Sequence, residues 1–202
     1  MSKLLIIGAG GHAKVVCDVA KDYYNEIVFA DDDKKGLTVL GCDVTYTVEE
    51  ALNGEKSDFI VAIGNNDVRE KLFFKFAKNG FNPVTLIHSS AVIGEEVEIG
   101  KGSVVFGGAV INAQASIGCG CIVNTGASVD HDCEIGNFSH VCPGGRIAGT
   151  VKCGEKCFFG VGSSVVNDVV IASRATFGAG AVVIGDVSEG GVYVGCPARK
   201  IK

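Results

Sequence analysis

The sequence lacks tryptophan, an excess of basic residues and any long apolar run. Its net charge is −5 and its isoelectric point is near 5.4, which gives no basic footprint for nucleic acid, so we expect no nucleic-acid partner. A membrane span needs about eighteen or more apolar residues in succession, whereas the run at residues 4–7 leads directly into glycines. We therefore expect no membrane association, no export signal and a cytoplasmic location.

The most regular feature of the chain is a six-residue repeat. The 102 residues from 86 to 187 divide into seventeen hexads with no residue left over. The second position of every hexad is apolar and the sixth is small or Val, as with Ile87 and Ala91 in the first hexad. A period of six fits neither a helix nor a simple strand, and hexapeptide repeats indicate a β-helix with about eighteen residues per three-sided coil. We predict this fold in preference to a β-sandwich, and the absence of bulky indoles suits so narrow a prism.

The nine cysteines fit the repeat better than a disulfide framework or a metal site. An odd number in a chain without an export signal argues against disulfides. Cys121, Cys133 and Cys157 fall at the small sixth position and Cys153 at the apolar second position. We expect them to face the coil interior as small hydrophobic residues, and we expect no metal. Cys119 with Cys121, and Cys153 with Cys157, are the pairs nearest to ligand spacing.

Upstream of the repeat, short apolar strands alternate with helical patterns. Strands are expected at residues 3–7, 27–30 and 58–63, and helical patterns occur at 15–20, 49–52 and 69–79. This order predicts an α/β, Rossmann-like βαβ domain with parallel strands over residues 1–84. The β-helix would then occupy residues 85–187, and residues 188–202, which leave the register, would form a last strand or tail.

The ends of these strands carry residues suited to a nucleotide. Gly8-Ala9-Gly10-Gly11-His12 joins the first strand to a helix, an arrangement that directs backbone N–H groups at a phosphate. Asp31-Asp32-Asp33 follow the second strand. The glycine pattern also matches a nicotinamide-binding loop, but the domain is about half the size of a full dinucleotide fold, so a nucleotide joined to another group fits better. A plain tight turn beside a solvated acidic loop is the remaining alternative.

The four histidines are His12, His88, His131 and His140. His131 is followed by Asp132, and both fall at hexad positions that face away from the interior. An imidazole beside a carboxylate on an outer edge is a candidate general base, with the carboxylate fixing its tautomer; a plain surface histidine is the alternative. His140 lies half a coil away on another face, so a joint role with His131 would need neighbouring subunits. His88 is assigned a structural role.

Several short motifs together cover nearly the whole chain. They are Gly8 to His12, Phe29 to Asp32, Ala62 to Asn66, Leu86 to His88, Asn124 with Thr125, His131 with Asp132, Phe138 to His140, and Val194 to Ala198. In combination they resemble the bacterial sugar acyltransferases of the sialic-acid O-acetyltransferase type, and most of all the UDP-4-amino-sugar N-acetyltransferases of bacillosamine biosynthesis. The chain departs from that family at Cys196, where Val is common, and at Asp132, where many relatives have Glu.

The resemblance implies a left-handed β-helix, a homotrimer with active sites between subunits, and acetyl-CoA as co-substrate. His131 would take a proton from the sugar amine as it attacks the thioester, and Asp132 would orient the imidazole. The residues that the resemblance assigns to acetyl-CoA are His140, which would hydrogen-bond the thioester carbonyl, Asn124, Gly149, Val161, Gly178 and Ala179. Those assigned to the nucleotide sugar are Gly8, Gly10, Gly11 and His12 for the diphosphate, Asp31 and Asp32 for the uridine, and Ile63, Gly64 and Asn65 for the base or ribose.

The function that follows is N-acetylation of a UDP-4-amino-4,6-dideoxyhexose by direct transfer from acetyl-CoA. Such a reaction needs a base, an oxyanion donor and correct placement, without a metal or a covalent intermediate. O-acetylation of sialic acid and N-acetylation of a GDP-linked amino sugar are alternatives on the same fold. From other classes, a nicotinamide-binding sensor and a non-catalytic scaffold trimer also stay open.

Overall fold

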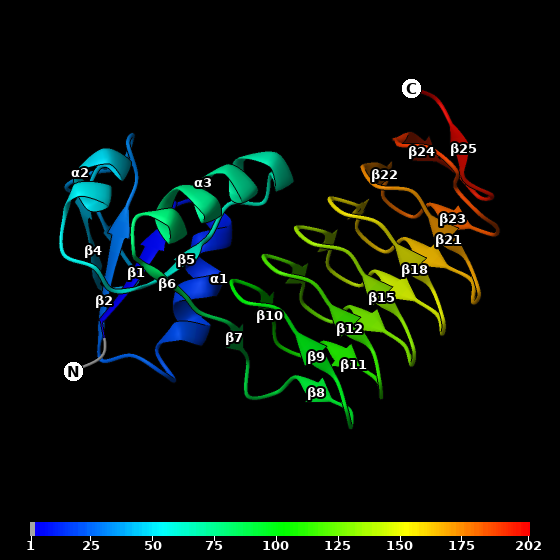
Figure 1. Ribbon diagram of the computed structural model, residues 1–202, viewed down its shortest axis with the longest axis horizontal. Coiled ribbons are helices and arrows are strands. Elements are labelled where there is room, and N and C mark those ends of the chain that lie inside the picture. The colour runs from blue at the N-terminus through cyan, green and yellow to red at the C-terminus, as the bar shows by residue number, and fades with distance from the viewer. Residues whose placement is uncertain (1–2) are drawn as a thin grey trace. The chain divides into compact units, whose positions relative to one another are not determined.

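The computed structural model describes residues 3–202. Contacts divide the chain into two compact units, residues 1–86 and 87–202, and Figure 1 labels the elements of both. The first two residues of the domain expected over 1–84 lie outside the described residues. Across the described range, no helix combines the length and the apolar character needed to cross a bilayer.

The first unit contains a six-stranded sheet with the order β3-β4-β2-β1-β5-β6. Its strands are β1 (Lys3–Ile7), β2 (Glu26–Ala30), β3 (Thr38–Val39), β4 (Cys42–Tyr46), β5 (Asp58–Val61) and β6 (Asn82–Pro83), and its helices are α1 (Gly11–Ala20), α2 (Val48–Asn53) and α3 (Asn66–Lys78). β1 pairs in parallel with both β2 and β5, so that Ile7 lies beside Ala30 and Val61. The loops after these three strands therefore share one edge of the sheet, the edge at which ligands bind in open α/β sheets.

Buried aromatic residues hold α3 on this sheet. Phe59 of β5 and Phe76 of α3 are both fully buried, and their ring centroids lie 5.7 Å apart. Phe81, just beyond the helix, packs at 5.0 Å from Phe76. The loop between β5 and α3 is thus fixed at both of its ends.

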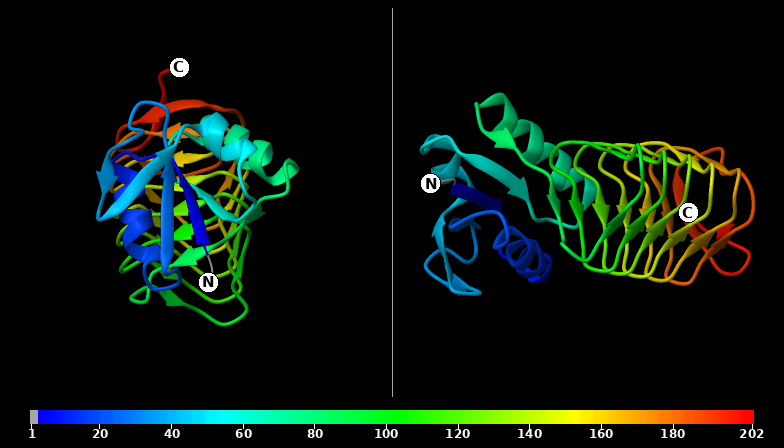
Figure 2. Two further views of the ribbon diagram at one scale, coloured as in Figure 1. Left: turned by 90° about the vertical axis from the view of Figure 1, so that its left-hand side faces the viewer. Right: turned by 90° about the horizontal axis from the view of Figure 1, so that it is seen from below.

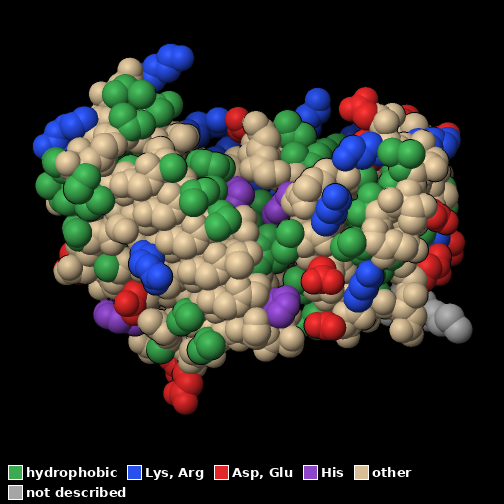
Figure 3. Space-filling view, turned by 180° about the vertical axis from the view of Figure 1, so that it is seen from behind, with side chains coloured by type: hydrophobic (Ala, Val, Ile, Leu, Met, Phe, Trp, Pro, Cys, Tyr) green, Lys and Arg blue, Asp and Glu red, His purple; other side chains and the backbone are tan. Residues whose placement is uncertain are grey.

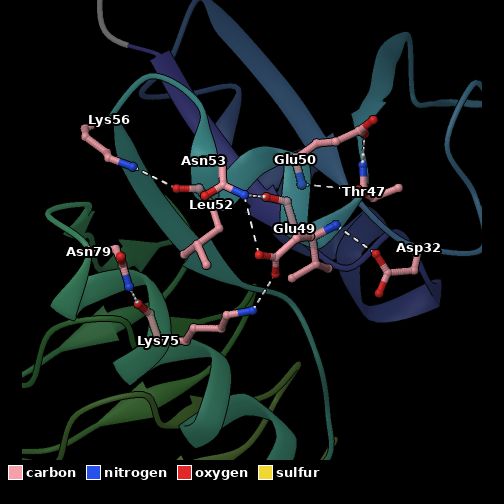
Figure 4. A network of polar contacts seen from close by, with 10 residues as sticks. Asp32, Thr47, Glu49, Glu50, Leu52, Asn53, Lys56, Lys75 and Asn79 are labelled. Atoms are coloured by element: carbon pink, nitrogen blue, oxygen red, sulfur yellow. Dashed lines mark hydrogen bonds and ion pairs between the residues drawn. The ribbon is translucent and has the colours of Figure 1, made fainter.

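Two of the helices begin at side-chain caps. α3 begins three residues earlier than the sequence pattern predicts, because Asn65 Oδ1 accepts a hydrogen bond from Val68 N at 3.0 Å. α2 begins at a capping box in which Thr47 Oγ1 accepts from Glu50 N (3.2 Å) and the Glu50 carboxylate accepts from Thr47 N (2.8 Å). Figure 4 shows this box together with Asp32, whose side chain reaches the same helix end.

The second unit is a β-helix whose short parallel strands form three sheets (Figure 2). The first sheet consists of β7 (Leu86–Ile87), β10 (Val104–Val105), β13 (Ile122–Val123), β16 (His140–Val141), β19 (Phe158–Phe159), β22 (Ala175–Phe177), β24 (Gly191–Val194) and β25 (Arg199–Lys200). The second consists of β8 (Val92–Ile93), β11 (Val110–Ile111), β14 (Ser128–Val129), β17 (Arg146–Ile147), β20 (Ser164–Val165) and β23 (Val182–Val183). The third consists of β9 (Glu98–Ile99), β12 (Ser116–Ile117), β15 (Glu134–Ile135), β18 (Lys152–Cys153) and β21 (Val170–Ile171).

Each coil stacks on the next in the register that the hexads predict. Ile111 pairs with Val129, eighteen residues further on, and both side chains are fully buried in the interior. Cys121, Cys133 and Cys157 are buried as predicted, and Cys153 with them. The predicted fold class, an α/β Rossmann-like domain followed by a left-handed parallel β-helix, is confirmed. After residue 187 the chain forms β24, parallel to β22, and then turns back as the antiparallel β25.

Candidate active site

His131 and Asp132 occupy the turn between β14 and β15. Asp132 has a φ of 58°, the left-handed conformation that this turn requires. Its Oδ2 lies 2.7 Å from His131 Nδ1, and both side chains are about half exposed. A carboxylate can only accept, so Nδ1 carries the proton and Nε2 keeps its lone pair. This is the arrangement that a general base needs.

Carboxylates around His131 favour its protonated form. The pKa of His131 lies above its ordinary value, first because of the hydrogen bond to Asp132 and then because of the charges of Asp130, Asp132 and Asp168. Asp130 Oδ1 accepts from Asn112 Nδ2 and from His131 N, both at 2.8 Å, and these bonds lower the pKa of Asp130. Asp130 precedes His131 directly in the sequence, so this second carboxylate could have been identified there.

Gly149 lies one coil beyond His131 and directly against its ring. A Cβ atom on Gly149 would approach His131 Cε1 and Nε2 to 2.6 Å. The backbone continues the stack, because Thr150 N donates to His131 O (2.9 Å) and Asp168 N donates to Gly149 O (3.1 Å). We call this turn, with its stacked counterparts, the His131 edge.

The other residues assigned to acetyl-CoA gather on a different edge. Asn124 follows β13, and Gly178 holds the corresponding position three coils later, while Val161 and Ala179 hold the next position in successive coils. Val161 is exposed, and its carbonyl accepts from Gly180 N at 2.8 Å. We call this turn the Asn124 edge. The sheet that contains β14 separates the two edges, so the structure places Gly149 with His131 and the remainder with Asn124.

His140 and Asn124 meet within this second edge. Asn124 Nδ2 lies 3.0 Å from His140 Nε2, while Asn124 Oδ1 accepts from Thr125 N at 2.8 Å. Because the amide oxygen already faces a donor, the NH₂ group donates to Nε2 and the imidazole proton is assigned to Nδ1. His140 is 7% exposed, and Phe158 packs edge-on against its ring at 5.2 Å between centroids.

A groove of the second unit runs along the sheet that contains β15. Its volume is about 1070 Å³, and its lining includes Glu96, Gln114, Asp132, Asn137 and Glu155. Asp132 thus faces this groove from the His131 edge. The space-filling view in Figure 3 shows histidine side chains reaching the molecular surface.

In the first unit, the loops after β1 and β2 are joined by hydrogen bonds. Asp31 Oδ2 accepts from Ala9 N at 2.7 Å, and its Oδ1 accepts from Asp33 N at 3.0 Å. Lys34 Nζ donates to Ala9 O at 2.8 Å. The lysine was not among the candidates from the sequence, although its place after an acidic run at a strand end was a signal. It brings a cation to the glycine loop.

The glycines of that loop have two different roles. Gly8 has a φ of 99°, and a Cβ there would lie 3.0 Å from Ile63 Cγ1 and 3.1 Å from Ala62 O, so only glycine lets the loops after β1 and β5 pack together. Gly10 and Gly11 have open space around them, with no atom within 4 Å of an added Cβ. They leave the N-terminus of α1 accessible to a ligand.

His12 and Asp32 are placed with other partners. Burial, followed by the charge of Arg69, lowers the pKa of His12 to about 4, so this imidazole is neutral at neutral pH.

Asp32 Oδ1 accepts from Val48 N at 2.8 Å and so supports the start of α2 (Figure 4). Glu49 of the same helix pairs with Lys75 of α3 at 2.9 Å. Nothing in the sequence distinguished Arg69 from a solvated helix residue, yet it is 1% exposed.

The residues of the described range include no group of three or more His, Cys, Asp or Glu placed to hold a metal ion. His131 and its neighbours instead offer proton transfer, and the glycine loop offers backbone donors.

Comparison with known proteins places this geometry in a family. Residues 3–76 match the PglD N-terminal domain family. The chain is 34% identical over 111 residues to UDP-N-acetylbacillosamine N-acetyltransferase of Bacillus subtilis (strain 168), a match that covers 52% of this chain and 51% of that protein, about half the length of the curated relative.

Solved structures match over a greater length. The acetyltransferase domain of PglB from Neisseria gonorrhoeae FA1090, in complex with acetyl coenzyme A, is 40% identical with a TM-score of 0.94 and 98% of each chain covered. PerB from Caulobacter crescentus, in complex with CoA and GDP-perosamine, is 38% identical with a TM-score of 0.92, covering 100% of this chain and 98% of that one. The resemblance drawn from the motifs is thereby confirmed. This chain belongs to the family of PglD-type sugar N-acetyltransferases that includes the PglB acetyltransferase domain and PerB.

Proposed function

We propose that the protein transfers an acetyl group from acetyl-CoA to the amine of a nucleotide-linked 4-amino-4,6-dideoxyhexose, with His131 as the general base. One observation carries the proposal: Asp132 holds His131 Nδ1 at 2.7 Å on an exposed edge, which leaves Nε2 available. A PglB domain solved with acetyl coenzyme A and PerB solved with CoA and a GDP-linked amino sugar support the same pair of substrates.

The proposed chemistry balances at His131. Nε2 accepts a proton from the acceptor amine, whose lone pair forms the new C–N bond at the thioester carbonyl. Asp132 stabilises the resulting imidazolium through Nδ1–H. When the tetrahedral intermediate collapses and the C–S bond breaks, the imidazolium returns its proton to the departing CoA sulfur. His140 and Asn124 would supply hydrogen bonds to the thioester carbonyl oxygen, as assigned from the resemblance.

Charge around His131 favours an amine over sialic acid as the acceptor. Asp130, Asp132 and Asp168 all act on the imidazole electrostatically. The carboxylate of sialic acid is repelled by these three carboxylates, whereas the neutral amine that attacks the thioester is not. We therefore keep O-acetylation of sialic acid as the second candidate and N-acetylation of an amino sugar as the first.

The first unit would bind the nucleotide diphosphate. The open N-terminus of α1 at Gly10 and Gly11, together with Lys34 beside Ala9, provides backbone donors and a positive charge. His12 would contribute as a neutral imidazole. The uridine nucleotide is proposed from the resemblance and from the Bacillus relative, with the guanine nucleotide of PerB as the alternative.

Because one β-helix carries His131 and His140 on separate edges, we propose a homotrimer in which the His131 edge of one subunit faces the Asn124 edge of the next. Val161, Gly178 and Ala179 would then line the path of the pantetheine arm, and Gly149 would lie beside the reacting thioester.

A mass-spectrometric assay tests the proposal directly. Acetyl-CoA is offered with a UDP-4-amino-4,6-dideoxyhexose, a GDP-4-amino sugar, sialic acid and serine, and the gain of one acetyl group is measured. We expect transfer to a nucleotide-linked amino sugar and a fall in kcat of about 10² or more in His131→Ala, with acetyl-CoA binding retained. Transfer to none of these acceptors would contradict the proposal. NADH binding at micromolar concentration without transfer would favour the sensor, and neither activity would favour the scaffold.

A further inference from the structure

Arg69 is a cation buried where burial is unfavourable. It lies in the first turns of α3 and is 1% exposed. Removing a guanidinium from water costs free energy, and the positive end of a helix dipole adds to that cost. Strong hydrogen bonds must therefore compensate, and the partners of Arg69 identify what it stabilises.

Hydrogen bonds link Arg69 to the loop that follows β5 and to Asn66, the first residue of α3. Arg69 Nη1 donates to Ile63 O at 3.0 Å and to Gly64 O at 3.1 Å, and Nη2 donates to Asn66 Oδ1 at 2.7 Å. One planar guanidinium thus holds two consecutive carbonyls of the loop and a side-chain oxygen at the start of α3, a geometry that the single nitrogen of lysine cannot reproduce.

Fixing these carbonyls also fixes the N–H groups on the other side of the same peptides. In a planar trans peptide the C=O of one residue and the N–H of the next point in opposite directions. Because Ile63 O and Gly64 O face Arg69, the N–H groups of Gly64 and Asn65 face away from it. Within residues 3–202, neither N–H donates a backbone or side-chain hydrogen bond. They lie at the carboxyl edge of the sheet, where α/β folds bind ligands.

Neighbouring contacts keep the loop from adjusting in other ways. Ala62 N donates to Ile7 O at 2.8 Å, and Ile63 packs against Gly8 of the glycine loop. Asn65 caps α3 with its side chain. The remaining freedom of the loop is the rotation of the two peptides that Arg69 holds.

We propose that Arg69 is a positioning residue for the nucleotide: it aims the N–H groups of Gly64 and Asn65, as a pair of donors, at acceptor oxygens of a nucleoside diphosphate. The inference rests on the proposed function, since it requires that the first unit bind a nucleotide sugar. Arg69 itself remains beneath the loop and acts through the two peptides.

Two variants at this position and one control test the proposal. Arg69→Lys keeps the charge but loses the forked geometry, and Arg69→Met removes both. Lys71→Met removes an exposed cation from the same helix two residues away and serves as the matched control. Affinities for UDP and GDP are measured by calorimetry, and KM and kcat are measured for the nucleotide-linked amino sugar and for acetyl-CoA.

We expect Arg69→Lys to lower the affinity for the preferred nucleoside diphosphate, and to raise KM for the nucleotide sugar, by about tenfold to a hundredfold. This is the effect expected from the loss of two hydrogen bonds between the loop and the nucleotide. kcat at saturation and KM for acetyl-CoA should change less than twofold, and Lys71→Met should match the wild type throughout. A role in stability alone would lower the melting temperature of Arg69→Lys yet leave its nucleotide affinity unchanged, and that result would overturn the inference.

The outcomes separate this inference from the function on which it rests. If wild-type protein binds UDP or GDP and Arg69→Lys binds equally well, only the role of Arg69 is overturned. If wild-type protein binds neither nucleotide, the proposed function fails and the inference fails with it. If Arg69→Met does not fold, Arg69→Lys alone decides the matter.

Discussion

The His131 ring lies so close to Gly149 that a Cβ atom at residue 149 would come within 2.6 Å of Nε2. The two residues occupy the same turn in successive coils, eighteen positions apart. Nε2 is the nitrogen left free by the bond between Nδ1 and Asp132. The His131 imidazole can therefore occupy this position only because residue 149 has no side chain.

The first prediction concerns this contact. Gly149→Ala should displace the imidazole and lower kcat by about tenfold to a hundredfold, because misplacing a catalytic group by about 1 Å can cost that much. Steady-state kinetics with saturating acetyl-CoA measure the effect. Gly185→Ala is the matched control, since Gly185 occupies the same turn two coils further on and has open space around it.

A double variant distinguishes displacement of His131 from damage elsewhere. If Gly149 acts through the imidazole, adding Gly149→Ala to His131→Ala should lower kcat no further. Additive losses would show that residue 149 contributes independently of the base.

The second prediction is a pH profile. The neutral form of His131 is the active base, and its pKa lies above the ordinary value of about 6.5. kcat/KM should therefore rise with pH through this raised pKa. Asp132→Asn removes the largest cause of the rise, so the acid limb should move to lower pH while the maximal rate falls. Asp168→Asn should move the limb in the same direction by less, and an unmoved limb in Asp132→Asn would contradict the assignment.

The third prediction concerns the coil corner at Gly120. Its φ is 62°, and a Cβ would lie 2.4 Å from the Phe138 ring. Gly126 has a φ of 63° with no atom within 4 Å. Gly126→Ala should cost about 1–2 kcal/mol for the left-handed backbone, and Gly120→Ala should cost about a further 1–3 kcal/mol for overpacking. Urea unfolding compares the two, and equal losses would show that Phe138 moves aside freely.

The fourth prediction separates two neighbouring aspartates. Asp31 joins the loops after β1 and β2, whereas Asp32 supports the start of α2. Asp31→Ala should raise KM for the nucleotide sugar, because the glycine loop loses the hydrogen bond that Ala9 N donates to Asp31. Asp32→Ala should lower the free energy of unfolding by about 0.5–1 kcal/mol. A large rise in KM for Asp32→Ala would instead favour direct contact between Asp32 and the nucleotide.

The repeat made the β-helix predictable, because residues such as Ile111 and Val129 satisfy the same local rule in every coil. The capping role of Asn65 could not be read from the apolar pattern, because Asn65 lies outside it. The predicted start of α3 was therefore too late. The pairing of His131 with Asp132 could be anticipated from adjacency in the sequence. Arg69 and Gly149 could not, because their importance comes from atoms brought close by folding.

The eighteen-residue register also sets distances along the β-helix axis in fixed steps of one coil. Residue 187, the end of the last hexad, lies 56 positions or about three coils beyond His131, and each coil adds roughly 4.8 Å along the axis. Removing one whole coil would leave every face and edge in register but shorten this distance by a fixed step. Ligand length could thus be selected by the number of coils, independently of the residues that perform the chemistry.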